Sequence, residues 1–200
     1  MTRVTALRAP RPDRVAVELD GRHWRTLPLE PVVRAGLRVG EELDRPRLRL
    51  LRRELRRHET IAAAVRALRH RDRSGHELDE RLARGGATAA ERADALAALE
   101  RAGLVDDGRF AASRARSLAE RGWGDAGIRA ELERHEVAPE SVEQALAALP
   151  PERERALQLV RRRGGGPATA RYLLARGFDG DAVEAALERF VADDPGAALR

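Results

Sequence analysis

The sequence contains no cysteine and no lysine, and aromatic residues make up only 3% of it. The absence of cysteine excludes disulfides and zinc–thiolate sites, and it is typical of the reducing cytoplasm, where we expect this protein to work. No apolar run approaches the roughly 18 residues that a transmembrane helix needs, so we expect no membrane association. The first residues, Met1–Val4, lead into no apolar segment, and no secretory signal is predicted.

All 38 cationic Lys/Arg positions are arginine, and they are unevenly distributed. Residues 1–75 hold 19 arginines against 10 acidic residues, whereas residues 76–200 hold 19 against 23. Arginine suits bidentate phosphate contacts, although a GC-rich genome would favour the same choice of residue. The basic first third of the chain indicates a polyanionic partner more strongly than the total charge does.

The first stretch of the chain predicts a small β-containing module. Two short β-prone runs, Val15–Leu19 and His23–Leu27, flank Asp20-Gly21, which is a typical hairpin turn. An earlier strand near Arg3–Leu7 could pair with this hairpin. A short helix that stops at Gly36 and a helix over residues 45–57 complete a basic module that we assign to residues 1–57.

After Glu59 the sequence predicts helix after helix, because stop and start signals are plentiful. Ser74 with Glu77 and Thr88 with Glu91 have the spacing of capping boxes. Acidic residues stand at three further helix starts, where N-cap acceptors belong: Asp106, Asp125 and Asp179. The predicted helices cover residues 59–72, 75–84, 89–102, 106–121, 125–135, 139–148, 152–163, 167–176 and 180–192.

These nine helices divide into three groups that share apolar positions at fixed offsets. Leu82, Leu132 and Leu173 are each followed 14 residues later by another leucine. A step of ten residues from the same three leucines gives Arg92, Val142 and Val183, and a step of five gives Ala87, Val137 and Phe178. Single three-helix units are too small to bury their own apolar faces, and stacking buries them. We therefore predict a mainly α fold in residues 58–200, with three tandem three-helix repeats (about 59–104, 105–150 and 151–194) forming a curved solenoid-like body.

Motifs for catalysis are absent. The five histidines have no metal-ligand spacing, and the glycines at 164–166 are not followed by the Gly-Lys-Ser/Thr of a phosphate-binding loop. The paired carboxylates Asp106 and Asp107 are explained by capping of a helix. We expect a protein that is not an enzyme and that needs no cofactor and no metal.

Arginine-bearing segments are the stronger candidates for binding. Arg66, Arg69 and Arg73 would share one helical face, and several arginines follow the predicted helix 106–121 into its exit loop. Trp123 between two glycines would either wedge into an interhelix corner, which we favour, or stack on a base or partner. Such faces contact phosphates or acidic grooves, but a merely solvated face is an equal alternative. The candidate contacts are Arg69, Arg73, Arg109, Arg114, Arg116, Arg121 and Trp123.

Several of these segments resemble a known family. The run Gly103–Ala111, with Arg116, Arg121–Gly124 and Ile128–Leu132, is similar to the central signature of the RecX family. Ala67–Leu82 and Tyr172–Asp179 are similar to the first and third repeats of that family, so the resemblance covers about residues 59–192. The front hairpin resembles the extension of longer members.

The resemblance implies a cytoplasmic regulator of the RecA recombinase in DNA repair and the SOS response. Such a protein would dock along the RecA filament on single-stranded DNA and damp its ATPase, strand-exchange and coprotease activities. It would be a monomer without catalysis or cofactor, with weak affinity for single- and double-stranded DNA. A nucleic-acid-binding helical-repeat module without a RecA role is the alternative. Arg92 and Ala87 depart from the family pattern, so loose packing of the first repeat is expected.

Overall fold

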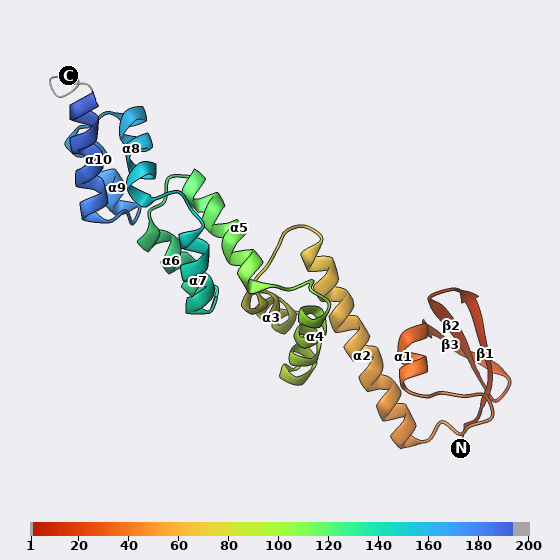
Figure 1. Cartoon of the computed structure of the whole chain (residues 1–200). Helices are drawn as coiled ribbons and strands as arrows, with labels where there is room; N and C mark the ends of the chain where they lie inside the picture. Colours follow the sequence, from red (N-terminus) through yellow and green to blue (C-terminus); the bar gives the residue numbers. More distant parts are fainter. Residues whose placement is uncertain (1, 194–200) are drawn as a thin grey trace. The chain divides into compact units, whose positions relative to one another are not determined.

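The computed structural model describes residues 2–193, and within them a three-stranded antiparallel sheet is followed by ten helices (Figure 1). This confirms the predicted fold class, mainly α with an N-terminal β module. The chain divides into two compact units. The first unit comprises Met1–Arg71 and Asp79–Ala102, and the second comprises Asp72–Leu78 and Gly103–Arg200.

The sheet has the order β1 (Val4–Arg11), β2 (Arg14–Leu19), β3 (Arg22–Pro28). The predicted hairpin turn is confirmed: Asp20 and Gly21 have φ angles of 50° and 78°, as a tight two-residue turn requires. The turn is tied to the residue before β1, since the Asp20 carboxylate accepts a hydrogen bond from the N–H of Arg3 over 2.8 Å.

One face of the sheet is covered by α1 (Leu29–Arg34) and by the start of α2 (Arg45–Leu68). Alternate residues of β2, Val15 and Val17, are buried together with Val32 of α1 and Leu51 of α2. This period of two follows from the pleat of the strand. The β module and α2 therefore share one apolar core.

Two helices predicted at 45–57 and 59–72 are wrong in their boundaries, because α2 is one unbroken helix. No glycine or proline interrupts the chain near residue 57, so the backbone hydrogen bonds continue through it. The helix ends at Leu68 because Arg69–Arg73 offers no apolar side chain to bury, and Ser74 then starts the next helix. Consequently Arg73 does not lie on the helical face of Arg66 and Arg69, as the sequence had suggested.

The remaining helices lie close to their predicted positions. They are α3 (Gly75–Arg84), α4 (Ala89–Arg101), α5 (Asp107–Glu120), α6 (Asp125–Arg134), α7 (Pro139–Ala147), α8 (Glu152–Arg163), α9 (Pro167–Ala175) and α10 (Gly180–Asp193). The capping box of Thr88 and Glu91 is complete, and the Asp106 carboxylate accepts the N–H of Arg109 at 2.9 Å. The prediction for Asp125 was wrong by one residue: Gly124 is the N-cap, which frees the Asp125 carboxylate for another contact.

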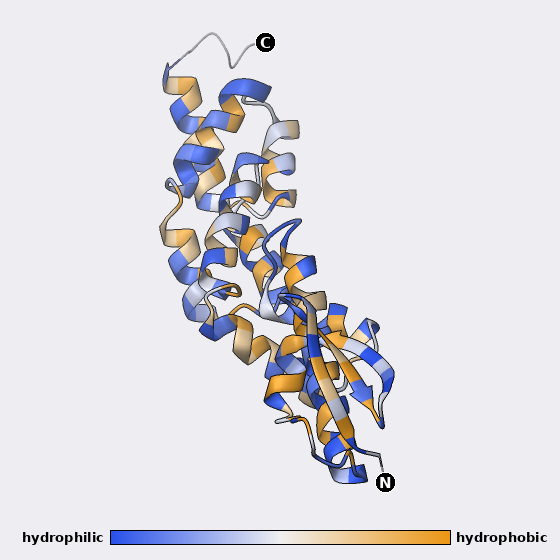
Figure 2. Cartoon of the chain, turned by 90° about the vertical axis from the view of Figure 1, so that its right-hand side faces the viewer, coloured by the Kyte–Doolittle hydropathy of each residue, from blue (hydrophilic) through white to orange (hydrophobic). Residues whose placement is uncertain are grey.

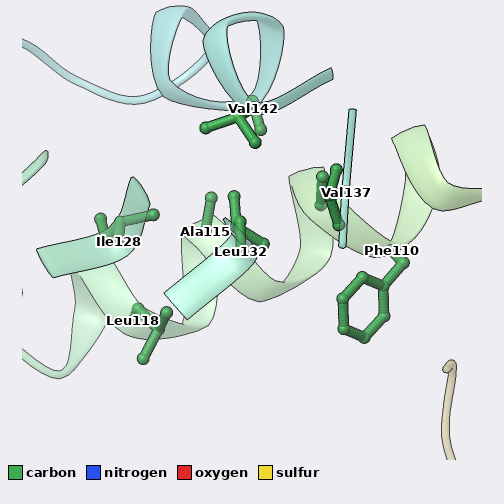
Figure 3. Close-up of a cluster of buried hydrophobic side chains, with 9 residues drawn as sticks. Phe110, Ala115, Leu118, Ile128, Leu132, Val137 and Val142 are labelled. Carbon is green, nitrogen blue, oxygen red and sulfur yellow. The ribbon is translucent and has the colours of Figure 1, made fainter. Parts of the chain in front are cut away.

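The second and third repeats each pack their first helix against their last, α5 on α7 and α8 on α10. In α5–α7 the side chains of Phe110, Leu118, Ile128 and Leu132 point into one cluster (Figure 3). Hydrophobic and hydrophilic residues are interleaved along the helices, as expected where each buries one face (Figure 2).

The repeat positions read from the sequence are buried in both of these repeats. Val142 and Val183 are 1% and 4% exposed, and Val137 and Phe178 are 5% and 4% exposed. In the first repeat Arg92 stands at the position of the two valines. The Arg92 guanidinium makes polar contacts there instead: it donates hydrogen bonds to Asp79 Oδ1 (2.8 Å) and to the Ala87 carbonyl (3.0 Å).

Candidate interaction surfaces

Three of the candidate arginines lie exposed on α5 and its C-cap: Arg109, Arg116 and Arg121. Arg109 reaches back to the carbonyls of Gly103 and Leu104 at 3.2 and 3.3 Å, so its guanidinium is held beside the helix start. Arg121 donates to Ser117 Oγ at 2.8 Å. Arg116 has no ion pair with any described residue. These three retain N–H groups toward solvent.

Arg114 is directed inward, where it pairs with Glu131 of α6. Glu131 is 9% exposed and also receives Arg134, while His135 lies 3.6 Å from it with its ring edge against Phe110. The hydrogen bond from Arg114 holds the pKa of Glu131 below its ordinary value of 4.5, against an opposing effect of burial. This arrangement ties α5 to α6.

Arg69 and Arg73 lie in different settings. Arg69 is the exposed C-cap of α2 in the first unit, and its N–H donates to the Val65 carbonyl. Arg73 lies in the second unit, before α3, half-buried and 3.9 Å from Glu77. The Glu77 carboxylate also lies 3.6 Å from His135, so Arg73 belongs to a charged cluster inside that unit.

Trp123 occupies the corner between α5 and α6, which was the favoured alternative. Its ring is half-buried against the α5–α7 core, with the Arg176 guanidinium 5.3 Å from its centroid. Its carbonyl accepts a hydrogen bond from Arg155 over 2.8 Å. Arg155 is itself buried and pairs with Asp125, which explains why that carboxylate leaves the capping position.

A strongly basic feature on α2 was not singled out from the sequence, although its residues lie within the helix predicted over residues 45–57. This 24-residue helix carries eight arginines against two glutamates. Arg45, Arg49, Arg52 and Arg56 recur at intervals of three and four and share one face, here called the α2 arginine stripe. The first three are exposed and have no ion pair with a described residue, whereas Arg56 pairs with Glu91 at 2.7 Å.

A groove of about 730 Å³ in the first unit begins where the α2 arginine stripe ends. Its walls come from α2, from the end of α3 and from the following Gly85-Gly86 turn. Arg66 and Arg81 face it from opposite elements, both exposed and without an ion pair to a described residue. The groove is lined by Arg56, Glu59, Thr60, Ala63, Arg66, His70, Arg81, Leu82, Arg84, Gly85, Gly86, Ala87 and Glu91.

Residues 2–193 contain no group of three or more His, Cys, Asp or Glu side chains placed to hold a metal ion. Across the same residues, none of the helices combines the length and apolar character needed to cross a bilayer. The candidate surfaces are therefore described by their arginine side chains and by the groups that these contact.

Comparisons with known proteins agree with this architecture. The family model described as RecX, second three-helix domain, matches residues 106–146. Regulatory protein RecX of Stenotrophomonas maltophilia (strain R551-3) is 35% identical over 153 residues, covering 72% of this chain and 93% of the relative. Regulatory protein RecX of Xanthomonas campestris pv. campestris (strain B100) is 36% identical over 144 residues, covering 67% and 88%.

Two solved structures share the fold. A crystal structure of regulatory protein RecX matches with a TM-score of 0.81 at 20% identity, over 92% of this chain and 98% of its own. RecX from Lactobacillus salivarius matches with a TM-score of 0.60 at 18% identity, over 67% and 96%.

The fold and its surfaces define a tandem three-helix-repeat protein with arginine-rich faces. The chain belongs to the RecX family, whose curated relatives are named regulatory proteins. The predicted membership of the RecX family is thereby confirmed, and the segment 106–146 that matches the family model includes Arg121–Gly124.

Proposed function

We propose that this protein is a cytoplasmic, non-catalytic regulator that binds RecA and its filament on single-stranded DNA and lowers the filament's activities. The observation that carries the proposal is family membership over two thirds of the chain, joined to a repeat body whose arginines face solvent. Repeats present contacts at regular intervals, which suits a partner that is itself a repeating filament. The proposed effect is on ATP hydrolysis, strand exchange and coprotease activity, through many modest contacts.

The proposed contact set keeps the seven residues named from the sequence and divides them by role. Arg69, Arg116 and Arg121 are exposed and would contact the partner directly, and Arg109 would do so beside them. The other three are engaged within the protein and would hold the surface in shape: Arg73, Arg114 and Trp123.

A test of these contacts is the affinity for RecA filaments assembled on single-stranded DNA. Arg116→Gln/Arg121→Gln should weaken binding about tenfold, since two charge-assisted contacts are lost. Arg153→Gln/Arg171→Gln is the matched control, because both arginines are exposed, lie in the same unit and have no ion pair with a described residue. Equal affinities for the two double variants would remove α5 from the interface.

A second candidate function, nucleic-acid binding without a RecA role, is supported by the α2 arginine stripe and the groove. Arg45, Arg49 and Arg52 extend unpaired charge along α2, and Arg66 and Arg81 continue it into the groove. Cationic groups spaced regularly along a helix suit a phosphodiester backbone. This candidate predicts that the protein alone binds single-stranded DNA tightly and leaves RecA unaffected when DNA is in excess.

A further inference from the structure

Four side chains in the second unit stack alternately as cation and aromatic ring. Arg163, the last residue of α8, lies 3.9 Å from the ring centroid of Tyr172 in α9. Arg176 lies 5.2 Å from the same ring and 5.3 Å from the ring of Trp123. We call the series Arg163, Tyr172, Arg176 and Trp123 the arginine–aromatic ladder. It joins the third repeat to the α5–α6 turn.

The aromatic side chains of the ladder are held in place by the apolar cores of their repeats. Tyr172 and Trp123 are half-buried, and each packs against the core of its own repeat. The backbone beneath Arg176 is also held, since its carbonyl accepts the N–H of Gly124 over 3.0 Å. A guanidinium held on an aromatic face loses little further freedom when it binds a ligand.

The two arginines of the ladder carry charge that the protein does not neutralise. Neither Arg163 nor Arg176 has an ion pair with a described residue. The carboxylates at this junction are already engaged: Asp125 pairs with Arg155, and Glu152 accepts the N–H groups of Asp125 and Asp179. Arg163 is exposed and Arg176 is half-buried, and their guanidinium N–H groups suit paired hydrogen bonds to a carboxylate or phosphate.

We propose that the arginine–aromatic ladder binds a protein segment carrying two carboxylates. The guanidinium carbons of Arg163 and Arg176 lie 3.9 and 5.2 Å from the centroid of the same Tyr172 ring, so they are at most about 9 Å apart. Side chains two residues apart in an extended segment project on one side, about 7 Å from each other, which fits this span. This inference rests on the proposed function in one respect, that the partner is a protein.

Two observations favour an acidic protein segment over nucleic acid at this surface. The Tyr172 ring is already contacted by the guanidinium groups of Arg163 and Arg176. Trp123 is half-buried and is contacted by Arg176, so neither ring leaves much area on which a base could stack. Residues 103–200 hold 15 arginines against 17 acidic residues, a balance that does not attract a long phosphate chain.

Trp123 allows a direct test with the full chain, because the sequence has only two tryptophans. In a Trp24→Phe background, a deca-glutamate peptide titrated at low ionic strength should change the Trp123 fluorescence saturably. Arg163→Gln/Arg176→Gln should weaken this binding about tenfold or more. Arg153→Gln/Arg171→Gln, with the same loss of charge in the same unit, should leave it within about twofold.

A variant that keeps both charges distinguishes loss of binding from loss of folding. Arg163→Lys/Arg176→Lys keeps both charges but lacks the planar fork, and it should bind the peptide about threefold or more weakly. Peptide binding that is absent, or that is equal in the wild-type and both ladder variants, overturns the proposal. So does a ten-nucleotide oligothymidylate that binds as tightly as the peptide and is weakened by the same substitutions. The assay contains no RecA, so a protein that binds the peptide but leaves RecA unaffected overturns the proposed function alone.

Discussion

Arg92 of α4 donates a hydrogen bond to Asp79 of α3 over 2.8 Å, at the repeat position that Val142 and Val183 fill in the other two repeats. An ion pair thus replaces an apolar contact in the first repeat. Asp79→Ala should cost about 1 kcal/mol of unfolding free energy, because the half-buried Arg92 then loses its carboxylate and keeps only its hydrogen bond to the Ala87 carbonyl. Asp79→Ala/Arg92→Leu should recover that loss. Urea denaturation measures both, and a double variant less stable than Asp79→Ala would contradict the replacement.

The Arg114–Glu131 pair predicts a dependence of stability on acid. Because the hydrogen bond from Arg114 lowers the pKa of folded Glu131 below 4.5, its contribution is complete at higher pH and is lost as pH falls through the folded value. Glu131→Gln should therefore destabilise by about 1–2 kcal/mol at pH 7 and by less below pH 4. Thermal unfolding at both pH values measures this. Glu133→Gln, an exposed neighbour on α6, is the control and should lose almost nothing at either pH.

Gly124 should tolerate no side chain. Its N–H donates to the Arg176 carbonyl, and a Cβ there would overlap the backbone of Gly177 and Phe178. Gly124→Ala should therefore destabilise the second unit by about 3 kcal/mol or more, since two backbone segments must separate. Gly180→Ala is the control, because a Cβ there meets nothing within 4 Å. Near-equal denaturation midpoints for the two variants would show that this close approach does not exist.

The α2 arginine stripe should set the salt dependence of DNA binding by the protein alone. Each phosphate contact on single-stranded DNA contributes about 0.7 to the slope of log affinity against log salt. Arg49→Gln/Arg52→Gln should thus lower the slope by about 1.4 for every oligonucleotide sequence tried. Fluorescence anisotropy over a salt series measures it. An unchanged slope would place the phosphate contacts elsewhere.

Much of the architecture follows from local chemistry. The Asp20-Gly21 turn, the Thr88 capping box and the repeat spacing through Leu132 and Leu173 each depend on a few neighbouring residues, and the structure confirms them. The length of α2 was missed because continuation of a helix past residue 57 is signalled only by the lack of a breaker.

The candidate surfaces were less predictable, because exposure and pairing are tertiary properties. Arg114 and Arg116 look alike in the sequence, yet one reaches Glu131, 17 residues away, and the other faces solvent. The arginine–aromatic ladder joins Trp123 to Tyr172 and Arg176, which lie about 50 residues later in the chain. Local sequence patterns do not predict contacts over that separation. Charge counts identified the basic end of the chain but not the helix that carries it.

The most direct test of the central claim is the single-stranded-DNA-dependent ATPase of RecA, titrated with this protein in its folded form. We predict a rate that falls progressively and saturably as this protein is added at sub-stoichiometric to stoichiometric ratios. The proposed action on the filament predicts that the inhibition persists when DNA is in excess, whereas competition for DNA predicts that it disappears. An ATPase rate that is unchanged at a stoichiometric excess of this protein would contradict the account.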